Sequence, residues 1–104
     1  MKCKSFDRFF ETIANKTRMK IINVLFKNPM SVSEICKETK EEQSKISHNL
    51  KILRDCRIID SKTKGKQRIY SLNKETMIPL MQLVEKHVSK YCGKSCPRLK
   101  WKST

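Results

Sequence analysis

Two clusters of polar and basic side chains in this 104-residue sequence have the chemistry to bind a polyanion. The first lies on the outer side of a segment whose apolar residues Ile46, Leu50 and Leu53 recur at helical spacing. Serine and glutamine can bond base edges, lysine suits phosphates, and a helix fits the major groove of DNA. We expect His48 to contact a phosphate or a base rather than a metal. The predicted contacts are Gln43, Ser44, Lys45, Ser47, His48 and Lys51.

The second cluster has four cations within seven residues and no acid between them: Lys62, Lys64, Lys66 and Arg68. Gly65 lies among them and supplies the positive φ that a hairpin tip needs. A basic hairpin beside a groove-binding helix can reach the flanking backbone or the minor groove. The sequence therefore predicts a second DNA contact there.

Apolar spacing and capping signals predict the elements that hold these clusters. Asn15 caps the second helix, Ser31 and Glu34 form a capping box, and Pro79 requires the last helix to begin near Thr76. We expect helices over residues 6–13, 16–26, 32–39, 42–56 and 76–91, and strands over 57–61 and 67–72 joined by a loop at 62–66. The fold class is thus mainly α with a small β-hairpin (α+β), in the order ααααββα of a winged helix-turn-helix.

Composition favours the same class. The chain carries 24 Lys and Arg against 10 Asp and Glu, a net charge of +14, although a solvated lysine face would explain the charge alone equally well. No apolar run reaches the roughly 18 residues of a membrane span and no signal-peptide pattern opens the chain, so we expect neither a membrane protein nor a secreted one. The odd count of five cysteines favours reduced thiols and a cytoplasmic location. We expect one domain over residues 1–92 for DNA binding and dimerisation, and a basic tail over 93–104.

Three motifs resemble those of the ArsR/SmtB family of winged-helix repressors. Residues 13–22, IANKTRMKII, are similar to the family's LADPTRLRIL, residues 43–54, QSKISHNLKILR, to QSTVSHHLKVLR, and residues 68–72, RIYSL, to VYYRL. The resemblance implies a homodimer that binds an inverted repeat in an operator through its paired subunits, with an inducer, often a thiophilic metal or metalloid, that lowers DNA affinity. It also implies a glycine after the recognition helix, where this chain has Arg57; a left-handed arginine costs about 1 kcal/mol relative to glycine.

The resemblance places the dimer interface on the first and last helices. Their apolar stripes are too rich for a small chain to leave exposed, although they could instead pack within one subunit. The interface residues would be Phe6, Phe9, Phe10, Leu80, Leu83, Val84, His87 and Val88.

The family's metal box, ELCVCDL, corresponds to residues 30–35, where both cysteines are replaced by serine. Its zinc site on the last helix would find only His87, with Glu85 on a different face. We expect Cys36 and Cys56 to be small buried hydrophobes. Cys92 and Cys96, with Cys3, could hold a thiophilic metal or As(III) or form a regulatory disulfide, and inert tail cysteines are an equal alternative.

These residues favour a sequence-specific regulator, most simply a repressor, over three alternatives. A nucleoid-type protein would coat DNA without sequence preference, and a winged helix could also serve protein interaction. An enzyme is the weakest reading, because the sequence has no Gly-rich phosphate loop and no paired carboxylates in an apolar setting. Cys92 lies five residues from His87, which is poor geometry for a nucleophile and its base.

Overall fold

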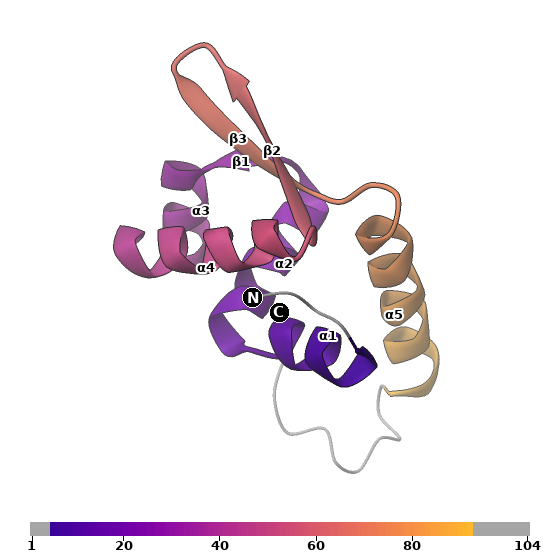
Figure 1. The fold of residues 1–104 in the computed structure, drawn as a ribbon. Coiled ribbons are helices and arrows are strands. Elements are labelled where there is room, and N and C mark those ends of the chain that lie inside the picture. The colour runs from indigo at the N-terminus through magenta and orange to yellow at the C-terminus, as the bar shows by residue number, and fades with distance from the viewer. Residues whose placement is uncertain (1–4, 93–104) are drawn as a thin grey trace.

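The computed structural model of the protein describes residues 5–92, in the order α1–α2–β1–α3–α4–β2–β3–α5 (Figure 1). This is the predicted winged helix-turn-helix with one addition, a short strand between the second and third helices. None of the helices within residues 5–92 has the length and apolar character needed to cross a bilayer.

The first three helices begin at side chains that cap them. Ser5 Oγ accepts from the N–H of Arg8 at the start of α1 (Phe6–Ile13), and Asn15 Oδ1 accepts from the N–H of Arg18 at the start of α2 (Lys16–Lys27). Before α3 (Val32–Thr39), Ser31 and Glu34 bond each other's backbone N–H in the predicted capping box. Each cap satisfies a donor that the helix itself leaves unpaired.

The fourth helix, α4 (Gln43–Asp55), lies between two residues with left-handed backbone. Lys40 has φ 59° in the turn after α3, and Arg57 has φ 60° after α4. The N–H of Ile58 donates to the Leu53 carbonyl at 2.9 Å and that of Arg57 to the Arg54 carbonyl at 3.0 Å. These two bonds are a Schellman motif, in which the left-handed position favours glycine. The expected backbone at Arg57 is therefore present.

The sheet differs from the prediction in its boundaries. β2 (Ile59–Lys64) starts two residues later than predicted because Arg57 and Ile58 close α4, and it includes the first three residues of the predicted loop. Lys64 pairs with Gln67 of β3 (Gln67–Leu72), so the turn is Gly65-Lys66 alone, and Gly65 has the predicted positive φ of 64°. β1 (Met30–Ser31), which the sequence analysis missed, pairs antiparallel with β3 and gives the order β1-β3-β2.

One apolar core joins these elements. It is built from Ile21, Ile22 and Leu25 of α2, Ile35 of α3, Ile46, Leu50 and Leu53 of α4, and Ile58, Ile59, Tyr70 and Leu72 at the strands. The last helix, α5 (Met77–Tyr91), begins after Thr76 as predicted and reaches this core through its buried first-half residues Met77 and Met81. The rest of α5 lies to one side of the other helices and the sheet (Figure 1).

Candidate nucleic-acid interface

The outward face of α4 carries all six of the predicted contact residues. Ile46, Leu50 and Leu53 are buried, as the predicted stripe requires. Since the buried stripe fixes the helix, the opposite face is held open to solvent. The six exposed side chains are Gln43, Ser44, Lys45, Ser47, His48 and Lys51.

Charge pairs restrain the lysines of this face. Glu41, just before α4, bonds Lys20 Nζ at 2.7 Å and Lys45 Nζ at 3.2 Å. The hydrogen bond from Lys20, and next that from Lys45, lowers the pKa of Glu41 from its ordinary value of 4.5. Lys51 lies 3.8 Å from Asp55 and remains largely exposed. Lys45 is therefore held in an ion pair with Glu41, whereas Lys51 is less restrained by its longer contact with Asp55.

The wing, residues 59–72, separates the four predicted cations by the alternation of its strands. Lys62 pairs with Ile69 and Lys64 with Gln67, which places both lysines on the outer face of the hairpin. Thr63 pairs with Arg68, on the face that also carries the buried Tyr70. Lys66 lies in the turn at the tip. All four are exposed, but the sequence analysis did not foresee that they face in different directions.

A groove of about 810 Å³ runs along this outer face of the wing. Arg57, Lys62, Lys64 and Lys74 line it together with two acids, Asp60 and Glu75. Because these four cations outnumber the two acids, the lining of the groove carries a net positive charge, as the wing does.

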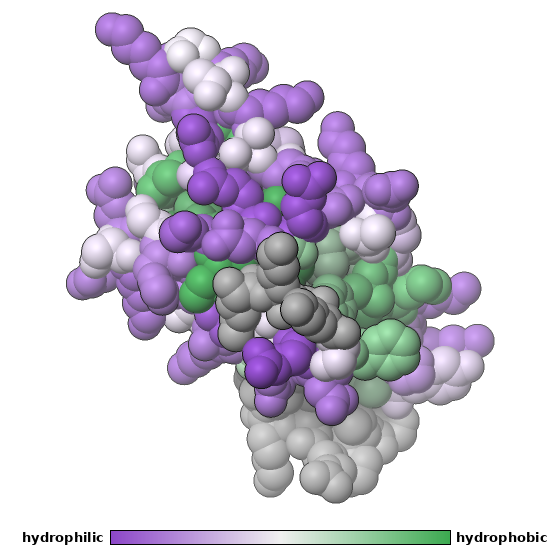
Figure 2. Space-filling view, viewed as in Figure 1, coloured by the Kyte–Doolittle hydropathy of each residue, from purple (hydrophilic) through white to green (hydrophobic). Residues whose placement is uncertain are grey.

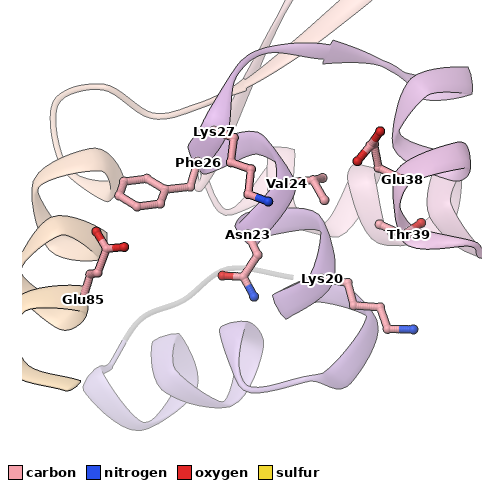
Figure 3. A pocket seen from close by; sticks show the side chains of 8 residues that line it. All are labelled: Lys20, Asn23, Val24, Phe26, Lys27, Glu38, Thr39 and Glu85. Carbon is pink, nitrogen blue, oxygen red and sulfur yellow. The ribbon is translucent and has the colours of Figure 1, made fainter. Parts of the chain in front are cut away.

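A second groove, of about 570 Å³, lies between α2, α3 and α5 (Figure 3). It contains none of the predicted contact residues. Charged side chains of both signs surround it, with Lys20, Lys27, Glu38 and Glu85 coming from three different helices. The mixed charge gives it no preference for an anionic ligand.

The predicted interface on α1 and α5 is apolar and open. Phe6 is 86% exposed, Phe10 55%, Leu83 65% and Val84 42%. His87 is exposed and its ring packs on that of Tyr91 at 5.0 Å between centroids. Phe9, Leu80 and Val88 are half-buried.

Figure 2 shows hydrophilic side chains over the wing and hydrophobic ones gathered beside α5. Contiguous apolar surface of this kind on a small domain is typical of a protein interface.

The three cysteines within the described residues are all partly buried. Cys36 and Cys56 are half-buried, so they are less enclosed than predicted. Cys92 is half-buried at the end of α5, while Cys3 and Cys96 lie outside the described residues. Within residues 5–92 no three His, Cys, Asp or Glu side chains come together as a metal site. Ser31, which stands in the region of the family's metal box, is occupied in capping α3.

Two further candidates, Arg18 and Asn49, were not predicted from the sequence. Asn49 is buried on the apolar stripe of α4, where its amide accepts a hydrogen bond from Arg18 of α2. A polar amide on a buried stripe needs a partner, and that mismatch was the available signal.

The comparisons with known proteins agree with this geometry. The arsR family of bacterial regulatory proteins matches residues 15–61. The transcriptional repressor SdpR of Bacillus subtilis is 34% identical over 64 residues, which are 62% of this chain and 71% of SdpR. The arsenical resistance operon repressor of the same species is 30% identical over 79 residues, 75% of each protein.

The chain covers a smaller share of two other relatives. An HTH-type transcriptional regulator from Mycobacterium tuberculosis is 29% identical over 67% of this chain, which spans 65% of that protein's length. A transcriptional repressor SmtB homolog from Synechocystis is 28% identical over 77% of this chain, which spans 61% of that protein's length. Among solved structures, a homodimeric winged helix-turn-helix DNA-binding domain from Mycobacterium bovis superposes with a TM-score of 0.75 at 22% identity, covering 83% of this chain and 80% of that one. This last likeness shows the fold.

These relatives are named as transcriptional regulators and repressors, in agreement with the prediction of a regulator rather than an enzyme. With two repressors matched over more than two thirds of their length, the chain belongs to the arsR family of bacterial regulatory proteins.

Proposed function

We propose that this protein is a homodimeric repressor that binds an operator in DNA sequence-specifically. One observation carries the proposal: the core-facing stripe of α4 leaves six short polar or cationic side chains exposed on the opposite face. Such a face can enter the major groove, where each base pair presents a distinct pattern of donors and acceptors. Because bacterial operator DNA lies in the cytoplasm, the proposal places the protein there.

Roles follow from side-chain chemistry. Gln43, Ser44, Ser47 and His48 would bond base edges and nearby phosphates. Lys51 would bind phosphate directly, and Lys45 would exchange Glu41 for phosphate. On the wing, Lys62, Lys64, Lys66 and Arg68 would reach the flanking backbone or minor groove.

The homodimer would form on α1 and α5, through Phe6, Phe9, Phe10, Leu80, Leu83, Val84, His87 and Val88. The exposed apolar side chains there support this assignment, and the Mycobacterium bovis domain of the same fold is described as homodimeric. In this proposal residues 1–92 are the DNA-binding and dimerisation domain. Residues 93–104 add four cations to it as a basic tail.

Selection of bound duplexes from a random DNA pool tests the proposal, followed by footprinting on the enriched sequence. We expect an enriched inverted repeat and a footprint with defined edges that survives competitor DNA. A pool without enrichment, and protection without edges, would instead identify a nucleoid-type protein that coats DNA.

We further propose that Cys92, with Cys96 and Cys3, senses a thiophilic metal, As(III) or oxidant that releases the DNA. Support comes from the serines in the family's metal box, so that a soft metal would need thiols elsewhere in the chain, and from the relative named for arsenical resistance. Titration calorimetry with As(III) and Zn²⁺ should show tight binding by the wild type and weak binding by Cys92→Ser/Cys96→Ser. Equal binding by both proteins would remove the sensing role.

A further inference from the structure

One arginine connects the end of α1 to the middle of α4. Arg18, half-buried in the first turn of α2, donates from Nε to the Thr12 carbonyl at 2.6 Å and from Nη1 to Asn49 Oδ1 at 2.9 Å. Thr12 lies near the C-terminal end of α1, where carbonyls lack partners within the helix. A single guanidinium therefore bridges the helix of the apolar face and the helix of the polar face.

The acceptor on α4 is held in a fixed orientation. Asn49 is 7% exposed, and its Nδ2 donates to the Lys45 carbonyl one turn earlier at 2.9 Å. That bond turns the amide oxygen toward Arg18. Ser47 and His48, which precede Asn49 directly, point outward from the same turn. Movement of Asn49 would therefore move the predicted base contacts with it.

Arg18 takes part in none of the ion pairs formed within residues 5–92, all of which use lysines. Its Nε and Nη1 instead donate to neutral oxygens on two different helices. The planar fork of arginine can hold two such acceptors at a fixed angle, which the single ammonium of lysine does poorly. The contact thus sets geometry more than it neutralises charge.

We propose that Arg18 and Asn49 are positioning residues that fix the angle of α4 relative to α1, and thereby set the half-site spacing that the dimer accepts. The inference rests on the proposed function, because it takes α1 as part of the subunit interface. Two-fold dimers of this class bind half-sites about 34 Å apart, one helical turn of DNA. A rigid link from interface to recognition helix makes that separation selective.

The test compares the full-length wild type with Arg18→Lys, Asn49→Ala and the double variant on two duplexes. One is the duplex enriched by wild-type selection, and the other has one base pair inserted between its half-sites. We expect the wild type to bind the second duplex at least about tenfold more weakly, a difference of about 1.4 kcal/mol. Each single variant should lose about tenfold on the first duplex, and its penalty for the insertion should fall to about twofold.

The double variant should bind no worse than the weaker single variant, because both substitutions break the same link. Asn49→Asp keeps an acceptor for Arg18 but loses the Nδ2 donor to the Lys45 carbonyl, so it should retain only part of the insertion penalty. Arg8→Lys, at an exposed arginine of α1, and Thr39→Val, which removes a buried hydroxyl bonded within α3, should keep the penalty.

Thermal melting and sedimentation confirm that each variant is folded and dimeric under the assay conditions. Equal losses on both duplexes for Arg18→Lys and Asn49→Ala, or additive effects in the double variant, would overturn the positioning role alone. A wild type that is indifferent to the insertion would instead overturn the proposed operator-binding dimer itself.

Discussion

Arg57 occupies a backbone conformation that suits glycine, at φ 60° after α4. We predict that Arg57→Gly raises the free energy of unfolding by about 1 kcal/mol, because glycine adopts this region without strain. For a domain of this size the melting temperature should rise by roughly 4–8 °C. Urea and thermal unfolding measure both quantities.

Arg54→Gly is the matched control, since it removes an arginine from the last turn of α4 where the backbone is helical. It should destabilise the domain by about 1 kcal/mol. If Arg57→Gly were neutral or destabilising, the guanidinium would have to make a compensating contact, for example with the carbonyls at the end of α4.

At the scale of single residues, the backbone conformation of Arg57 could be predicted from the sequence, whereas the contact of Arg18 could not. The strained position was predictable because a glycine is expected there by resemblance and the helix pattern ends there. The Arg18–Asn49 bond joins residues 31 positions apart, and neither periodicity nor capping chemistry reports such a pairing. Only the buried position of Asn49 indicated that a partner was required.

The wing is the element whose boundaries changed most between sequence and structure. Lysines at 62 and 64 read as loop residues because lysine is depleted in strands, but pairing with β3 extends β2 through them. β1 has two residues, too few for any period, and exists because Met30 and Ser31 pair with Tyr70 and Ile69. The helices were predicted closely because caps such as Asn15 and Ser31 are local signals.

For the wing we predict that Lys64→Ala/Lys66→Ala weakens binding to all duplexes by a similar factor. Each lysine that neutralises a phosphate adds about 0.9 to the slope of log affinity against log salt. The variant dimer lacks two lysines in each subunit, so the slope should fall by up to about 3.6. Fluorescence anisotropy across a salt series provides the measurement. Unchanged affinity and slope would favour a winged helix used for protein interaction.

Across the whole molecule, the proposed function assigns the polar face of α4 to DNA and the apolar face of α1 and α5 to a second subunit. We predict that Phe10→Glu/Leu83→Glu gives a folded monomer, because both side chains are already exposed in the single chain, at 55% and 65%. Two charges placed in an apolar interface oppose pairing by desolvation and repulsion. Sedimentation equilibrium should show the monomer mass, with circular dichroism unchanged.

Gln82→Glu, at an exposed polar position of α5, is the control and should remain dimeric. A dimer that persists in Phe10→Glu/Leu83→Glu would mean that the subunits pair through another surface. The link from α1 to α4 could then no longer set the half-site spacing.

The variant Gln43→Ala/Ser47→Ala/His48→Ala tests whether the outward face of α4 reads base sequence. Alanine favours helix, so the fold should persist. The measurement is the ratio of affinities for the selected duplex and a scrambled duplex at one salt concentration. With base contacts worth about 1–3 kcal/mol each, we predict that the ratio falls about 100-fold or more while affinity for scrambled DNA changes little. A variant that still discriminates between the two duplexes as the wild type does would mean that the outward face of α4 does not read base sequence.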